Sequence, residues 1–445
     1  MIRKLGLTIL VVGAALAGAG AYFRVQGAAL PGLPLPQFPG RLGQAIAEQD
    51  SVAVAELAAR RCRLLWSKSR RGCYEDFLLQ LVRHDQLRLA MGALALLGER
   101  DPEIRRYGHD YSHIIGINAW TPDKDIGAVY LQCNEIFQSG CYHGVIQAFF
   151  AYRGTDSASV ASLCRTTPGI KDNNWLHFQC VHGIGHGLVQ TYTMNLPHAL
   201  TGCDMLGNGW DSESCYGGAF MEFIVGGRGQ SHHPHVPAPP GAVTGAMDHA
   251  AMDHAQMSHP AAVADTWPAF KVRDRSDPLY PCSALGERYQ RACYQMQAGL
   301  IAEVTGLDFA KVASVCDRAP ELWRRWCYQG IGTYVSGVTA RDPAAAIHDC
   351  SLGALQYRPF CFVGLVKNFV DVTANTDDGI ALCKRLAPRD IATSCYVAVG
   401  EEASVLYPAM ERRAAACAKA ALEYVESCRY GAGLTTQRPQ GLPGG

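Results

Sequence analysis

The sequence predicts an all-α protein, a right-handed α-solenoid of about ten helical-hairpin repeats, each about 34 residues long and stapled by a disulfide. Two observations predict this class. The first is a cysteine, in most copies followed by an aromatic residue, that recurs from Cys293 to Cys428 with a nearly constant step of about 34 residues. This period is the length of a two-helix unit, and such units bury their apolar faces by stacking on their neighbours.

The second observation is that the 18 cysteines come in pairs. The recurring cysteine occurs at Cys73, Cys141, Cys180, Cys215, Cys293, Cys327, Cys361, Cys395 and Cys428, each a short distance after another cysteine. The step from Cys73 to Cys141 is twice the period, which implies a repeat without cysteines around Tyr107. There the partner position is Leu96, so both cysteines are missing together. Joint loss favours pairing within each unit, from Cys62–Cys73 to Cys417–Cys428.

The period and the paired cysteines resemble the tetratricopeptide and Sel1-like α-solenoids, and in particular the cysteine-rich Sel1-like proteins of bacterial secretions. The resemblance covers residues 43–432 in period and cysteine placement. The Trp, Leu-Gly and Tyr signature of tetratricopeptide repeats is absent. The resemblance therefore implies a helical-repeat architecture and carries over no functional residue.

The N-terminal residues 1–26 indicate export. Arg3 and Lys4 precede an apolar run over residues 5–23, as in a secretory signal peptide or an uncleaved signal anchor. The run is long enough to span a bilayer, which favours the anchor, although small residues suited to cleavage occur at 17–21. The rest of the chain is then periplasmic or otherwise extracytoplasmic, membrane-anchored or secreted, where disulfides persist. Residues 27–42 form a proline-rich linker.

The repeats fall into two blocks, residues 43–226 and 267–432, followed by a tail, 433–445, that we expect to be disordered. In the first unit we expect a helix ending near Cys62, a basic turn at residues 68–72 and a second helix from Cys73. In the second block, helices are expected at residues 343–350 and 360–373. This block contains a single histidine, His348, and is interpreted as scaffold.

Residues 227–266 interrupt the repeats with a Met/His-rich insert, which we expect to be a disordered loop because its composition cannot form a core. Six of its soft or borderline metal ligands recur at five-residue intervals: Met247, His249, Met252, His254, Met257 and His259. Thioether and imidazole groups suit both oxidation states of copper. The stretch resembles the Met-Asp-His repeats of periplasmic copper-resistance proteins, which implies copper contact. The alternative is a flexible linker of biased composition.

The remaining histidines concentrate in the first block and share positions in the repeat. His109, His143 and His182 lie two residues after the recurring position, and His113 and His186 lie six after it. Glu222 lies seven residues after the recurring cysteine of the next unit. Corresponding helices of stacked units lie about 8–10 Å apart, so these side chains can converge on one or two metal ions. The alternative is that the histidines are hydrogen-bonded within a tight helical core.

The ligand set predicts a transition-metal site, with copper favoured and zinc, iron and haem as the other cofactors that accept it. The function predicted is that of an exported, membrane-tethered protein for metal handling or delivery, whose partners are a metal ion and a membrane or periplasmic protein. The alternatives are a metal-free interaction scaffold and an oxidoreductase using the histidine centre. The 40 basic and 40 acidic residues, without a basic stripe, argue against nucleic acid as a partner.

Overall fold

The computed structural model describes residues 40–207, 209–226, 270–274, 276–339 and 341–443. Within these ranges the chain is all-helical, with 21 α-helices, three short 3₁₀ helices and no strand. The all-α class predicted from the sequence is thereby confirmed. Residues 1–39 and the Met/His-rich insert lie outside the described ranges. None of the described helices combines the length and apolarity needed to cross a lipid bilayer.

Ten helical pairs follow one another along the chain. The first helices are α3 (Ser51–Cys62), α5 (Leu87–Arg100), α7 (Ile126–Tyr130), α9 (Ser157–Thr166), α11 (Leu196–Asp204), η1 (Cys282–Ala284), α15 (Phe309–Cys316), α17 (Pro343–Cys350), α19 (Thr376–Cys383) and α21 (Met410–Cys417). The second helices are α4 (Ser67–Arg83), α6 (Pro102–Ala119), α8 (Gly140–Arg153), α10 (Asn174–Thr191), α12 (Trp210–Gly226), α13 (Glu287–Met296), α16 (Glu321–Val338), α18 (Arg358–Asp371), α20 (Arg389–Leu406) and α22 (Val425–Gly431). Outside the pairs lie α2 (Arg41–Ala47), α14 (Ala298–Thr305), η2 (Leu355–Tyr357) and η3 (Leu422–Tyr424).

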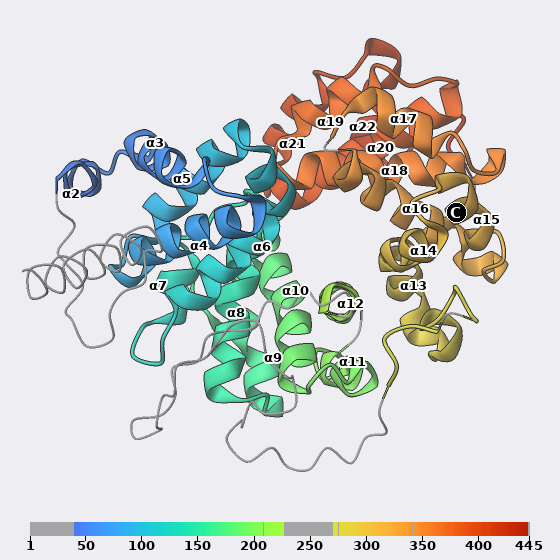
Figure 1. Ribbon diagram of the computed structural model, residues 1–445. Helices are drawn as coiled ribbons and strands as arrows, with labels where there is room; N and C mark the ends of the chain where they lie inside the picture. Colours follow the sequence, from blue (N-terminus) through green and yellow to red (C-terminus); the bar gives the residue numbers. More distant parts are fainter. Residues whose placement is uncertain (1–39, 208, 227–269, 275, 340, 444–445) are drawn as a thin grey trace, which may run out of the picture.

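The second helices form a continuous row. Each packs against the second helix of the following unit, from α4 through α8, α10 and α16 to α22 (Figure 1). Helix α10 also contacts α20, so the second block of repeats approaches the first. The helical repeats are therefore present, while the superhelix and its handedness stay predictions.

Most first helices begin at an Asp or Asn whose side chain accepts backbone N–H groups of the first turn. In α3 the Asp50 carboxylate accepts from the amides of Val52 and Ala53 at 2.9 and 3.0 Å. The same cap occurs at Asp125, Asp156, Asn195, Asp308, Asp342 and Asn375. Each cap satisfies amides that have no partner inside the helix, which fixes where each unit begins.

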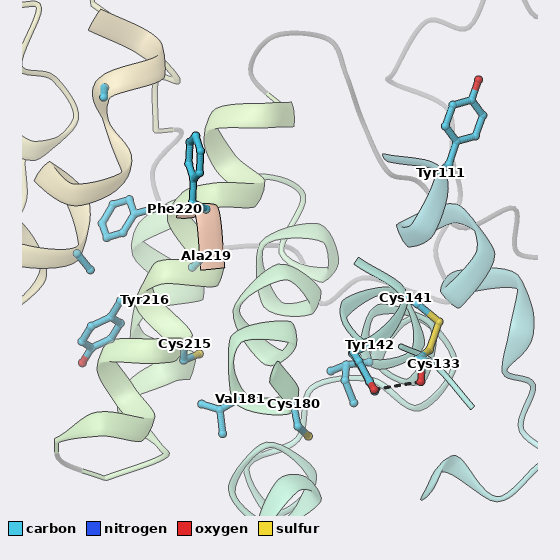
Figure 2. Packing of buried hydrophobic residues seen from close by; sticks show 14 of the residues in the cluster. Tyr111, Cys133, Cys141, Tyr142, Cys180, Val181, Cys215, Tyr216, Ala219 and Phe220 are labelled. Carbon is cyan, nitrogen blue, oxygen red and sulfur yellow. Dashed lines mark hydrogen bonds between the residues drawn. A yellow bond between two sulfur atoms is a disulfide. The ribbon is translucent and has the colours of Figure 1, made fainter. Parts of the chain in front are cut away.

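All 18 cysteines form nine disulfides inside the units, as the cysteine spacing predicted. Their Cα–Cα distances lie between 5.4 and 5.8 Å, within the usual range for disulfides. In seven units an aromatic residue follows the second cysteine and is buried. In four of them its hydroxyl donates to a residue near the end of a first helix. Tyr142 donates to the carbonyl of Cys133 at 3.0 Å (Figure 2). Tyr328 donates to Asp317, the residue after the first cysteine of its unit, at 2.8 Å.

Glycines in the second helices allow neighbouring backbones to touch. A Cβ on Gly185 of α10 would overlap the carbonyl oxygen of Cys215 in α12, and a Cβ on Gly218 would overlap that of His182. Such reciprocal pairs recur between α6 and α8, α16 and α18, and α20 and α22, at Gly116 and Gly144, Gly332 and Gly364, and Gly400 and Gly431. These glycines therefore serve close helix packing.

Three local expectations differ from the structure. Helix α4 begins at Ser67, so the stretch 68–72, with its three basic residues, is helical, consistent with the good helix propensity of Lys and Arg. The first helix of the sixth unit is replaced by the 3₁₀ turn η1. Residues 433–443, expected to be disordered, follow a defined path: Leu434 packs against the core, and its amide donates to the carbonyl of Arg429 at 2.9 Å.

Candidate metal centre

Five imidazoles converge from three successive second helices. Helix α6 carries His109 and His113, α8 carries His143, and α10 carries His182 and His186. The ring centroid of His143 lies 5.3 Å from that of His113, 4.9 Å from that of His182 and 5.0 Å from that of His186. The sequence register therefore placed these side chains on one face, even though more than two repeats separate the first from the last.

The five side chains form two groups of three that share His143. In each group, one nitrogen per ring lies within 4.8 Å of the others. The groups consist of His109, His113 and His143, and of His143, His182 and His186. Three imidazoles around one ion, with metal–nitrogen bonds of about 2.0–2.1 Å, hold these atoms roughly 3.3–3.6 Å apart. Either group could therefore hold a metal ion after a small inward rotation of its rings.

Hydrogen bonds to protein acceptors fix the rings of α6 and α8. His109 donates Nδ1–H to the carbonyl of Phe137 at 2.8 Å, and His113 donates Nδ1–H to Oε1 of Gln147 at 2.9 Å. His143 donates Nε2–H to Oε1 of Gln179, also at 2.9 Å. Because the acceptors are oxygen atoms without a proton, the opposite nitrogen of each neutral ring carries a lone pair, which is the form that binds metals.

Glu222 on α12 organises the far side of the cluster. Its Oε2 accepts Nδ1–H of His186 at 2.8 Å and an amide proton of Gln147 at 3.1 Å, and its Oε1 accepts an amide proton of Gln190 at 3.0 Å. The carboxyl group is almost completely buried. The sequence proposed Glu222 as a ligand, and the structure places its carboxylate against the outer nitrogen of His186. A carboxylate in this position orients a ligating imidazole and raises its basicity.

His182 lies beside α12. Its ring is hydrogen-bonded to the backbone of Ser214. The position that a Cβ of Gly217 would occupy lies 3.5 Å from Nδ1 of His182 and 3.7 Å from the methyl carbon of Met296 on α13. Phe178 covers another side of the ring, with centroids 5.8 Å apart.

Burial keeps the central rings neutral. It lowers the pKa of His143 well below its ordinary value, and the neighbouring histidines His182, His186 and His109 lower it further. Burial likewise lowers the pKa of His182, again with a contribution from His186 and His109. At neutral pH both rings therefore have a lone pair ready for a metal ion.

His177 of the same block shows the ordinary structural arrangement of a histidine. It uses both ring nitrogens within the protein, Nδ1 toward the carbonyl of Cys164 at 3.3 Å and Nε2 toward Asp211 at 3.0 Å. In contrast, Nδ1 of His143 is buried and makes no hydrogen bond with any described residue. The central histidine is thus not satisfied by the protein in the way that His177 is.

Sequence reasoning missed the acceptors that hold the rings. Gln147 lies six residues after Cys141, at the repeat position that His113 and His186 occupy in their units, so the register could have indicated it. Gln179 and Gln190 carry no such signal. The carbonyl of Phe137 belongs to three consecutive residues with positive φ, 55°, 56° and 63° for Phe137, Gln138 and Ser139. Of the proposed ligands, those in the insert, residues 247–259, lie outside the described residues.

The chain matches no protein-family model, no curated protein and no solved structure. Its class therefore follows from its own features. It is an all-helical protein of disulfide-stapled repeats, and its nine disulfides indicate an oxidising, extracytoplasmic compartment. It contains a buried histidine cluster that could hold a metal ion.

Proposed function

We propose that the protein is an exported metal-binding protein whose histidine cluster on α6, α8 and α10 holds a transition-metal ion. The observation that carries this proposal is the pair of three-histidine groups, each with its nitrogens within 4.8 Å. The outward hydrogen bonds of His109, His113 and His143 support it, because they leave an imidazole lone pair on each ring. The imidazole nitrogens of the cluster suit metals that bind nitrogen ligands, such as copper, zinc or iron.

We favour copper as the metal, and we propose that the protein handles or delivers it. Three neutral imidazoles in a buried setting suit copper. The Met/His-rich insert supports the same metal from its sequence alone. We propose further that residues 5–23 tether the protein to the membrane, which would keep the metal centre at the outer face of that membrane.

The test is the metal content of the full-length protein purified from its native membrane. We expect copper in at least stoichiometric amount by elemental analysis. Replacing His143, His182 and His186 together by alanine should remove the buried ion, because no complete three-histidine group is left, while the far-ultraviolet circular dichroism stays helical. The matched control is His348→Ala, because His348 is exposed on α17 and should leave the metal content unchanged. Protein that carries no transition metal would favour the interaction scaffold instead.

A further inference from the structure

The two three-histidine groups cannot be filled at the same time, because they share the single lone pair of His143. Its Nε2–H is engaged by the side-chain oxygen of Gln179, so only Nδ1 can bind an ion. This Nδ1 is buried and has no hydrogen-bond partner among the described residues. The neutral ring offers one coordination bond, and two ions would compete for it.

The two groups differ in their access to solvent. His109, in the first group, is the member of the cluster that is only half-buried. His143, His182 and His186, which form the second group, expose 3%, 8% and 1% of their surface. An ion arriving from solvent therefore meets the group of His109 first.

The two groups also differ in charge. The buried carboxylate of Glu222 accepts a hydrogen bond directly from His186 of the second group, and it accepts another from the side-chain amide of Gln147, whose oxygen in turn bonds His113 of the first group. In a medium of low dielectric constant, a cation is attracted more strongly to the ligand set that lies closer to a negative charge. The second group is therefore the more favourable position for a bound cation.

We propose that the cluster is a two-position relay for a single copper(I) ion, in which His143 is the shared ligand. The ion binds first to His109, His113 and His143, and then moves to His143, His182 and His186. This inference rests on the proposed function. Copper(I) fits the relay because imidazole ligands suit copper.

The transfer of the ion between the two groups needs no other reactant. The ion keeps its bond to Nδ1 of His143, loses its bonds to His109 and His113, and forms bonds to His182 and His186. All five ligands are neutral imidazoles before and after the exchange, so no proton and no electron is transferred. Glu222 stays hydrogen-bonded to His186 throughout and holds that ring in position.

The experiment uses the full chain with the insert made unable to bind copper. The nine alanine substitutions needed are at His232, His233, His235, Met247, His249, Met252, His254, Met257 and His259. Copper(I) ions are added in anaerobic buffer, and bound copper, association rate and dissociation rate are measured. Three single variants are made in this protein, His109→Ala, His143→Ala and His182→Ala, with His348→Ala as the control and circular dichroism as the check on folding.

We expect one copper per chain in the parent protein and in the control. His109→Ala should slow association about tenfold and still bind one ion, while His182→Ala should speed dissociation about tenfold, also with one ion bound. His143→Ala should lose stoichiometric binding, because it removes a ligand from both groups.

Three results would overturn the relay and leave a metal-binding protein. They are two ions bound per parent chain, complete loss of copper in both His109→Ala and His182→Ala, and normal binding by folded His143→Ala. The first would mean independent sites, the second a single five-ligand site, and the third a centre that does not use His143. A folded parent that binds no copper would instead overturn the proposed function itself.

Discussion

The carboxylate of Glu222 is buried, and N–H donors from His186, Gln147 and Gln190 hold it. Burial of a negative charge is costly unless hydrogen bonds or positive charge compensate it. A metal ion bound to His186 places positive charge one imidazole ring away. Glu222 is thus placed to support an ion that would bind His186, as carboxylates do in many metal sites.

Glu222→Gln tests this role at the residue scale. The glutamine has one acceptor oxygen where the carboxylate has two, and its amide group would face N–H donors that the carboxylate now satisfies. We expect metal affinity to fall by about 10- to 100-fold in a competition titration, with one ion still bound at saturation. Glu426→Gln, at an exposed position on α22, is the control and should leave affinity unchanged. Equal affinities in the two variants would contradict the role given to Glu222.

The lowered pKa values of His143 and His182 determine how the centre responds to acid. For histidines with the ordinary pKa of about 6.5, metal loading would fall as the pH drops through that value. Because burial lowers both pKa values well below 6.5, protons compete with the metal only at lower pH. We therefore expect metal retention after equilibrium dialysis to persist at about pH 6 and to fall in more acidic buffer. Loss centred at the ordinary histidine pKa or above would contradict the burial effect.

The same lowering of the two pKa values also makes the stability of the metal-free protein depend on pH. The unfolded chain binds protons on these two histidines near pH 6.5, whereas the folded chain binds them only at lower pH. Below pH 6.5 the unfolded state therefore binds more protons, and the free energy of unfolding must fall as the pH is lowered. Urea titrations of metal-free protein at about pH 7.5 and about pH 5.5 should show the lower midpoint in the more acidic buffer.

At the scale of the helix, the glycine contacts make the cluster geometrically feasible. The reciprocal contact of Gly116 and Gly144 brings α6 against α8, and that of Gly185 and Gly218 brings α10 against α12. Close helix axes are what allow imidazoles from three units to approach one another and Glu222 to reach His186. A larger residue at these positions must push two helices apart.

Gly185→Ala is the test at this scale. Its methyl group would overlap the carbonyl oxygen of Cys215, and backbone cannot yield as a side chain does. We expect a loss of about 1–3 kcal/mol in the free energy of unfolding by urea titration, and weaker metal binding. The control is Gly337→Ala in α16, where a Cβ meets nothing within 4 Å. That variant should be unchanged or more stable by up to about 1 kcal/mol, because alanine is the better helix former.

At the scale of the molecule, each unit carries its own covalent staple, with one exception, and contacts mainly its neighbours. Loss of one disulfide should therefore act locally. Replacing both Cys164 and Cys180 by serine should lower the free energy of unfolding by about 2–4 kcal/mol. It should also weaken metal binding, because α10 carries His182 and His186. The same change at Cys417 and Cys428 should cost a similar amount and leave metal binding intact. Equal effects of both pairs on metal binding would indicate coupling along the whole array.

The repeat frame was predictable because it follows from the spacing of the cysteines and from the regular period of the sequence. Cysteine spacing indicated all nine pairs, and the joint absence of cysteines at Leu96 and Tyr107 identified the unit without a disulfide. The convergence of the histidines followed from that frame, since equal repeat positions lie on the same face of stacked helices. The hydrogen-bond partners of the imidazole rings could be identified only from the structure. A glutamine amide such as Gln179 can bond almost any polar neighbour, so its sequence position alone does not reveal an imidazole as its partner.

The unit formed by α5 and α6 contains no cysteine, and Tyr107, two residues before His109, has non-helical dihedrals that bend α6. His109 and His113 thus lie on the hairpin that has no disulfide, while His182 and His186 lie on a helix that is cross-linked to Cys164 through Cys180. A hairpin without a cross-link deforms at lower cost, so the α6 rings can close on an incoming ion and open again with little elastic penalty. The more accessible group of histidines therefore includes the helix without a cross-link, and the more buried group includes the helix that a disulfide restrains.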